Sequence, residues 1–405
     1  MQRWKKNLYA LWITQIISLT SFGLGLPFLP FYIQKLGVVE PEQIKFFTGI
    51  LSTAPAVTMA IMAPVWGKLA DKYGRKLMIL RAMFFAILVI AGMGFVTNVW
   101  QLVILRGCQG LFTGTITAAT AFVAATTPKE RLSYALGVIS SSTFIGYTIG
   151  PVLGGYFADN FGFRFSFFLG SIVMLIGFLL VLFFVVEEKE VVVKGSEKQD
   201  SNKEKSNYKL FTPLVVSLIV VLFFHRVTRT IFSPYLPLYI QGVLNTTEGA
   251  SKLTGYINGI IGIASAVSGL TISRLGDKYD KLKIVTILLG IAFVVSLSLT
   301  KAGSLYMFAL LYGLLFFFIG GVEPIITSIT AENTRPERRG ELFGYQGLVG
   351  SIGWICSPMV GAYISMNYKV SSILYLIPAL LTINYLLLIS IRKRLNKKGN
   401  SLISK

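Results

Sequence analysis

Several ionisable side chains lie inside long apolar stretches of this chain, where a charge is costly and usually serves a purpose. Glu323 is the only acidic residue deep within such a stretch, in the segment Gly320–Pro324. Removal from water favours the neutral form of a carboxyl group, which suits a group that must bind and release a proton. We therefore predict that Glu323 carries a proton. The alternative is a permanent ion pair with an arginine.

A cluster of cations lies in a second apolar stretch. His225 and Arg229 are four residues apart and so share a helix face, while Arg226 is offset by one residue. His225, the only histidine, could titrate near physiological pH, although a lone histidine is commonly a structural residue. The two arginines need partners or an aqueous cavity. They either attract an anionic or zwitterionic group of a ligand or neutralise Glu323.

Arg106 and Gln109 belong to the segment Arg106–Gly110 inside a third apolar stretch. Arg106 could pair with a ligand, a carbonyl or a carboxylate as protonation changes, and Gln109 lies one turn further along on the same side. The alternative is a structural ion pair or hydrogen bond. Glu323, Arg106 and His225 form the predicted proton-coupling set. No acidic residue lies inside the first six apolar stretches, which argues against a strictly cationic ligand.

Membrane-spanning helices must position these residues. The chain has 405 residues, of which 54% are hydrophobic and 14% are charged, whereas ordinary globular chains carry about 25% charged residues. Apolar runs of roughly twenty residues, enough to cross a bilayer as a helix, recur along the whole length. We predict an all-α integral membrane protein with twelve spans, approximately 8–34, 46–67, 77–97, 100–125, 132–158, 165–186, 210–241, 252–272, 284–300, 304–330, 340–366 and 371–391.

The net charge of +20 follows a topological pattern. Most of the 38 lysines and arginines lie in the N-terminus, in alternate loops and in the C-terminal tail, which is the distribution expected of cytoplasmic segments. Both termini are therefore predicted to be cytoplasmic, and nucleic-acid binding is not expected. Cys108 and Cys356 fall in predicted spans, so we expect no disulfide framework, and we find no metal-binding motif.

The chain contains an internal repeat. Pro27–Gln34 matches Pro234–Gln241, and the charged loop Gly67–Lys76 recurs as Ser273–Lys281. Such a repeat predicts two parallel six-helix halves with a site between them near the middle of the membrane. The predicted segments are a first half at 1–186, a flexible cytoplasmic linker at 187–209, a second half at 210–391 and a basic cytoplasmic tail at 392–405.

Three motifs carry a resemblance to a known family: the loop Gly67–Lys76, the segment Arg106–Gly110 and the glycine-rich segment Gly146–Gly155. With them, nearly the whole chain resembles the major facilitator superfamily, and within it the twelve-helix drug:proton antiporters, such as bacterial multidrug exporters of the quinolone and fosfomycin/deoxycholate resistance type. The resemblance implies a proton-coupled exporter of amphiphilic drugs or related small molecules, working by alternating access in the bacterial cytoplasmic (inner) membrane. It implies no cofactor beyond a proton gradient, and a monomer whose partners are protons, lipids and a small amphiphilic substrate.

The charged loop is expected to act as a gate. Asp71 lies at the edge of a span, where a carboxylate could sit against the positive N-terminal end of a helix. The resemblance implies that this helix is the eleventh span, so the contact would latch the two halves. The alternative is that the loop cations only set topology. Family members often place a carboxylate at the end of span four, where this chain offers only Glu130 and Arg131 nearby. The expected gating residues are Gly67, Asp71, Arg75, Lys76, Asp277, Glu332 and Arg338.

The glycine-rich segment resembles the antiporter motif of this family. Gly146, Gly150 and Gly154 share one helix face, so another helix can approach closely. Pro151 removes a backbone hydrogen bond to Tyr147 and can bend the span. Such a helix between the halves would seal the cavity against leak, and simple glycine packing is the alternative. The motif residues are Gly146, Gly150, Pro151, Gly154 and Gly155.

A substrate cavity is also implied by the resemblance. Pockets that are apolar and aromatic with few polar groups bind varied amphiphiles. The residues expected to line it are Tyr32, Gln109, Tyr147, Arg226, Arg229, Tyr235, Tyr239, Tyr256 and Trp354.

Other functions remain as alternatives. The first is a dedicated exporter of an endogenous metabolite such as a carboxylate siderophore, whose carboxylates would suit Arg226 and Arg229. Uptake of a nutrient anion is the next. An enzyme is not expected, because the sequence shows no convergent catalytic set. A receptor would normally add a sizeable soluble domain, which the longest polar stretch is too short to form.

Overall fold

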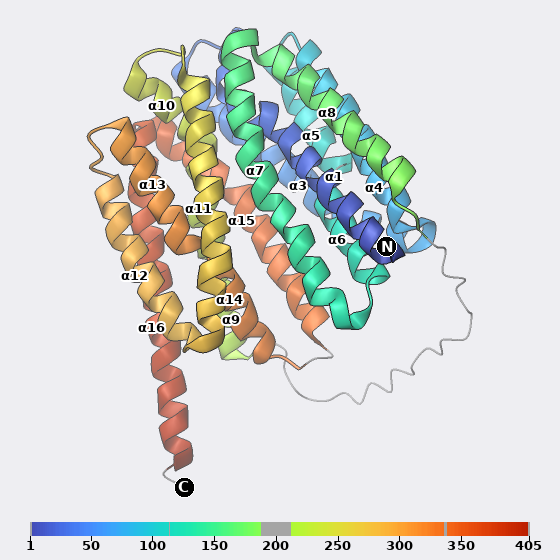
Figure 1. The fold of residues 1–405 in the computed structure, drawn as a ribbon. Helices are drawn as coiled ribbons and strands as arrows, with labels where there is room; N and C mark the ends of the chain where they lie inside the picture. The colour runs from blue at the N-terminus through green and yellow to red at the C-terminus, as the bar shows by residue number, and fades with distance from the viewer. Residues whose placement is uncertain (1, 113, 188–211, 336–337, 404–405) are drawn as a thin grey trace.

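The computed structural model describes residues 2–112, 114–187, 212–335 and 338–403, and within these ranges the chain is helical with short connections (Figure 1). Twelve helical stretches of the described residues are long and apolar enough to cross a membrane. The all-α, twelve-span prediction is therefore confirmed. The predicted linker falls almost entirely on residues outside the described ranges.

The first half contains the elements up to residue 184. Their bounds are α1 (Arg3–Gly25), η1 (Leu26–Phe28), α2 (Leu29–Lys35), α3 (Pro41–Tyr73), α4 (Arg75–Phe95), α5 (Val99–Phe112), α6 (Thr115–Thr126), η2 (Lys129–Arg131), α7 (Leu132–Phe161) and α8 (Phe163–Phe184).

The second half repeats the order of the α-helices. Its bounds are α9 (Pro213–Thr230), η3 (Ser233–Tyr235), α10 (Leu236–Leu244), α11 (Ala250–Lys278), α12 (Lys281–Leu299), α13 (Leu305–Gly320), α14 (Val322–Glu332), α15 (Arg339–Asn367), η5 (Val370–Tyr375) and α16 (Leu376–Ile403). Helix α16 continues through the stretch that the sequence assigns to a basic tail, and Figure 1 shows it projecting beyond the other helices.

Four of the twelve spans are interrupted, at corresponding positions of the two halves. The first and seventh spans pass through short 3₁₀ turns whose second residue is a proline, at positions repeated between the halves. The fourth span breaks before Gly114, which has a φ of +129°, and the tenth breaks at Gly321. Gly114 and Gly321 are equivalent in the repeat. Interrupted spans at equivalent positions of two repeats mark the place where membrane transporters form their binding sites.

The buried core is divided between the two halves. One cluster of buried apolar side chains contains first-half residues from Leu8 to Val185. A second cluster contains second-half residues, joined by Phe28, Phe31 and Ala158 of the first half. Each half therefore packs as its own unit.

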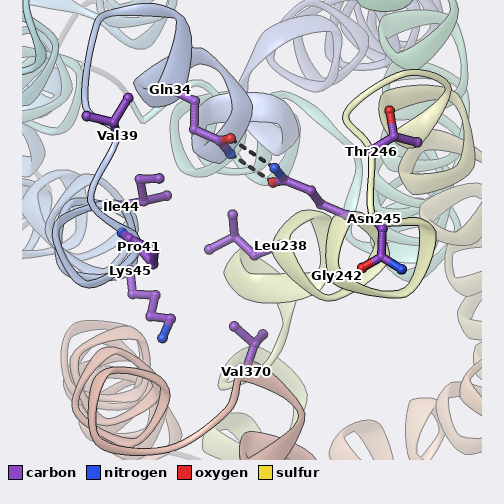
Figure 2. Close-up of a pocket in the computed structure, with 11 residues that line it drawn as sticks. Gln34, Val39, Pro41, Ile44, Lys45, Leu238, Gly242, Asn245, Thr246 and Val370 are labelled. Atoms are coloured by element: carbon purple, nitrogen blue, oxygen red, sulfur yellow. Dashed lines mark hydrogen bonds between the residues drawn. The ribbon is translucent and has the colours of Figure 1, made fainter.

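Contacts between the halves are concentrated toward one face of the molecule. We call the face on which α1 and α9 begin the basal face and the opposite one the distal face. Near the distal face, Gly155 of α7 lies against Ser251 of α11, and Gly49 of α3 lies against Ala362 of α15. Gln34 of α2 and Gln241 of α10 exchange hydrogen bonds there (Figure 2).

The basal ends of the same helices are open. A methyl group added at Gly67 of α3 or at Gly344 or Gly347 of α15 would meet no other atom within 4 Å. Toward the distal face α3 and α15 touch, because Thr53 donates a hydrogen bond of 3.0 Å to the carbonyl of Ile355. The structure is thus closed on the distal side and open on the basal side.

Candidate functional site

The strongest charge cluster of the described residues lies inside the second half. Glu323 sits in the first turn of α14, directly after the break at Gly321. Arg226 of α9 donates from Nε and Nη2 to one carboxylate oxygen of Glu323, at 2.9 and 2.6 Å. Its Nη1 donates to the carbonyl of Gln346 on α15 at 2.8 Å. Arg226 therefore ties three spans of the second half together.

A glycine makes room for this arginine. A Cβ atom at Gly350 of α15 would collide with the guanidinium of Arg226. The position was not singled out in the sequence, where it is one of 39 glycines. Gly350 acquires a role only because Arg226 crosses α15 at this point.

Arg229 and His225 complete the cluster. Nη1 of Arg229 lies 3.6 Å from the second carboxylate oxygen of Glu323, and its guanidinium lies 5.9 Å from the ring centre of Phe316. His225 is fully buried, and neither of its ring nitrogens has a hydrogen-bond partner among the described residues. With Glu323 ionised, the two arginines leave a net charge of +1. The side chains of Arg226, Glu323 and Arg229 are 22%, 26% and 28% exposed, so the ion pairs are not sealed from solvent.

Arg106 is held apart from this cluster, in the first half. Pro55 of α3 has no N–H, so the carbonyl of Leu51 lacks its helical partner. Arg106 Nε donates to that carbonyl at 2.7 Å, and Nη1 donates to Oε1 of Gln109. Both side chains are buried. This arrangement matches the structural alternative for Arg106.

Two of the expected cavity residues are placed elsewhere. Tyr32 and Tyr235 are fully buried, and their hydroxyls donate to the carbonyls of Met93 and Pro358 at 2.9 and 2.7 Å. In this conformation each hydroxyl bridges two helices, so a cavity-lining role for these two tyrosines stays a prediction.

The remaining aromatic candidates are less enclosed. Tyr147, Tyr256 and Trp354 are each about half exposed. Tyr239 packs against Phe308 with 4.6 Å between ring centres. Tyr147 lies on α7 between the face that contacts α1 and the face that contacts α11, which directs it toward the junction of the halves.

The charged loop joins α3 to α4 through Gly74, whose φ is +97°. The side chains of Asp71 and Asp277 lie outside the described part of the structure, so their expected latches stay predictions. Glu332 pairs with Lys281, and Arg338 pairs with Glu341 at 3.0 Å. Because the side chain of Asp277 is not described, a latch that joins it to Glu332 and Arg338 stays a prediction.

The antiporter motif divides its contacts between both halves. Gly146, Gly150 and Gly154 face α1 of the same half, where an added Cβ would strike Leu19, Gly23 or Leu24 respectively. Gly155 instead faces α11 of the second half. The close approach predicted for the glycine face is therefore present, but within the first half.

The described side chains at this site offer charges and hydrogen bonds. Among the described residues, no group of three or more histidine, cysteine or acidic side chains could hold a metal ion. The cluster of Arg226, Arg229 and Glu323 can exchange a proton and can attract a charged group.

Comparison with known proteins places this architecture in a family. A family model for the Major Facilitator Superfamily matches residues 11–316 and 218–404. The chain is 34% identical over 365 residues to the "Multi-drug resistance efflux pump PmrA homolog" of Lactococcus lactis, covering 89% of each chain. It is 31% identical over 387 residues to "Multidrug resistance protein MdtG" of Proteus mirabilis, covering 94% of each.

Solved structures share the fold. A bacterial homolog of the human lysosomal transporter Spinster, in an inward-facing and occupied conformation, superposes with a TM-score of 0.79 at 13% identity, over 97% of this chain and 98% of the other. The nucleoside transporter NupG gives a TM-score of 0.73 at 13% identity, over 96% and 99%. The chain therefore belongs to the major facilitator superfamily and is a secondary transporter related to multidrug efflux pumps.

Proposed function

We propose that this transporter exports amphiphilic small molecules in exchange for protons, and that Glu323 carries the proton. One observation carries the proposal: a carboxylate beside the break of the tenth span is held by two arginines, yet remains about a quarter exposed. A group that is both charge-paired and reachable from solvent can change its protonation state and its partners together.

Protonation of Glu323 would break the cluster. A neutral carboxyl no longer balances Arg226 and Arg229, and a partly buried charge that loses its partner is strongly destabilised. The guanidinium groups would then seek other partners, including the carbonyl that Arg226 already contacts on α15. Because the cluster joins α9, α14 and α15, proton binding would be transmitted to the packing of the second half.

The orientation of the protein in the membrane follows from the distribution of its positive charge. The basal face carries the N-terminus and the lysine- and arginine-rich loops, which supports a cytoplasmic basal face in a bacterial inner membrane. The basal opening would then admit substrate from the cytoplasm. Release would require the distal contacts between the halves to part while the basal ends come together.

A second candidate is a dedicated exporter of a metabolite that carries carboxylates, such as a siderophore. Arg229 supports it, because its described ion pair to Glu323 is longer than a hydrogen bond at 3.6 Å. A carboxylate could therefore bind Arg229 without first displacing a tightly held partner.

Proteoliposomes with an imposed pH gradient test these proposals. One set contains a cationic dye and the other a carboxylate-rich siderophore. Movement of dye against its own gradient that collapses with a protonophore would establish proton-driven multidrug transport. Gradient-driven movement of the siderophore alone would favour the dedicated exporter, and movement of neither would contradict both.

A further inference from the structure

The carboxylate of Glu187 is bonded to the charged loop between α3 and α4. Its two oxygens accept the backbone N–H groups of Arg75 and Lys76, the first two residues of α4, at 2.8 and 2.9 Å. These N–H groups have no partner within the helix. A carboxylate at the positive end of a helix makes charge-assisted hydrogen bonds, which are stronger than neutral ones.

The loop is shaped around this carboxylate. At Gly74, an added Cβ would approach Oε2 of Glu187 to 2.7 Å, and the φ of +97° is one that other residues rarely adopt. Gly74 is therefore required for two reasons at once. Nothing in the local sequence reveals this, because Glu187 follows Arg75 by 112 positions.

The loop cations are bonded to the same end of the first half. Arg75 Nη1 donates to the carbonyl of Ala121 on α6 at 2.8 Å, and Lys76 Nζ donates to the carbonyl of Leu182 on α8 at 3.0 Å. At the end of span four, where family members often have a carboxylate, Arg75 thus binds a backbone carbonyl instead. Glu187 supplies the negative charge from the end of span six.

The segment that carries Glu187 is itself anchored. The side chain of Asn7 on α1 donates to the carbonyl of Val186 at 2.8 Å and accepts from its N–H at 3.0 Å. Glu187 is therefore held by α1 on one side and binds the start of α4 on the other. All of these partners belong to the first half, so they can move with it as one unit.

This anchoring matters because described positions beside the loop are open toward the second half. The positions next to it, at Gly67 on α3 and at Gly344 on α15, are open. Closing the basal face requires the loop to arrive in a defined shape. A flexible loop would lose conformational entropy on docking and would weaken the closed state.

We propose that Glu187 is the positioning residue of the basal gate: it holds the α3–α4 loop in the shape that docks when the transporter closes on that side. The inference rests on the alternating access proposed above, but not on the identity of the substrate or on proton coupling. It assigns to Glu187 the role for which Glu130 and Arg131 were the nearby candidates in the sequence.

The test compares Glu187→Ala and Glu187→Asp with Glu130→Ala, a matched removal of one acidic side chain from the same face. Hydrogen exchange at the start of α4 reports the two backbone bonds directly. Spin labels at Ala125 and Asn333, the basal ends of α6 and α14, report opening between the halves in a background without Cys108 and Cys356. Neither measurement needs substrate or a proton gradient. Both can therefore be interpreted even if the proposed substrate or proton coupling is wrong.

In Glu187→Ala we expect faster exchange at Arg75 and Lys76, longer label distances and turnover lowered about tenfold, with KM within about twofold of the parent. Glu187→Asp should recover part of each change, and Glu130→Ala should change none. Parent-like exchange and label distances in Glu187→Ala would overturn the proposal, as would equal effects in Glu130→Ala. If Glu187→Ala does not fold, the isosteric Glu187→Gln is measured instead and must show the same direction of change.

Discussion

Gln34 of α2 and Gln241 of α10 bind each other through both atoms of their amide groups, at 2.8 and 2.9 Å (Figure 2). The two residues are equivalent in the internal repeat, so each half contributes the same residue to the pair. Clefts of about 400 and 590 Å³ lie on either side, and Gln34 lines both. The pair therefore bridges the halves between two recesses that open on the distal face.

Removing this pair is expected to favour opening of the distal face. Two neutral hydrogen bonds contribute about 1–3 kcal/mol together, which corresponds to a shift of roughly 5- to 150-fold in a two-state equilibrium. Gln34→Leu and Gln241→Leu should each shift spin-label distances across the distal face, and the double variant should shift them little further. Gln43→Leu, an exposed glutamine near the same face, is the control. Additive effects of the two changes would show that the residues act separately.

Gly350→Ala should displace Arg226 from Glu323 without altering any charge. The added methyl group occupies the space of the guanidinium, and overpacking of this kind costs about 1–3 kcal/mol. We expect proton-driven transport to fall about tenfold or more. Gly347→Ala lies one turn earlier on α15 in open space and should transport normally. If both variants behave like the parent, the contact of Arg226 with Glu323 has no part in transport.

Glu323→Gln should separate proton coupling from substrate movement. The amide keeps the size of the side chain and imitates the protonated carboxyl, but it cannot release a proton. Gradient-driven accumulation in proteoliposomes should fall at least about tenfold, while exchange at equal pH on both sides continues. Glu248→Gln, at an exposed acidic residue of the second half, is the matched control. Undiminished proton coupling in Glu323→Gln would remove this residue from its role.

Sequence patterns predicted the fold well because membrane-spanning helices have a strong signal in the sequence. Each span is a long apolar run, and the repeated prolines and glycines related the two halves before any contact was known. The breaks were not located in the same way. Gly114 and Gly321 are two of 39 glycines, and whether a helix breaks at a glycine depends on the neighbours that take over its free backbone groups.

The site was predicted in part for a similar reason. Ionisable residues within apolar runs stand out, so Glu323, Arg226 and Arg229 were found and their pairing was weighed as an alternative. Glu187 was not found, because it begins a polar stretch that the sequence assigns to a linker. Its partners in the charged loop are more than 100 positions away. Long-range partners of ordinary-looking residues leave no local signal.

The charge of the substrate is expected to set the sign of its coupling to protons. With Glu323 ionised the cluster carries +1, and protonation raises this to +2. A cationic amphiphile is then bound less well after protonation, which is the competition that exchange requires. A neutral amphiphile gains no coupling from this change of charge. An anion is bound better after protonation, and by linkage it promotes proton binding.

An inward-directed proton gradient should therefore drive cationic substrates out and carboxylates in. Transport of one dye and one carboxylate, measured in both directions with the parent and with Arg229→Gln, checks this. The variant should weaken the carboxylate more than the dye. Export of the carboxylate against its gradient by the parent would contradict this electrostatic argument and favour the dedicated exporter, whereas gradient-driven inward movement of the carboxylate would contradict the dedicated exporter.

The role of Arg106 can be decided by restoring the backbone bond that its guanidinium replaces. Pro55 leaves the carbonyl of Leu51 without a helical donor, and Arg106 supplies one at 2.7 Å. Arg106→Ala should therefore leave a buried carbonyl unsatisfied and cost about 1–3 kcal/mol of stability. In the double variant Pro55→Ala and Arg106→Ala, the new N–H of residue 55 can bond Leu51, so thermal stability should return toward that of Pro55→Ala alone. Transport separates the two roles. If Arg106 is structural, proton-driven transport recovers together with stability, whereas a stable double variant that still fails to couple protons would assign Arg106 to the coupling mechanism.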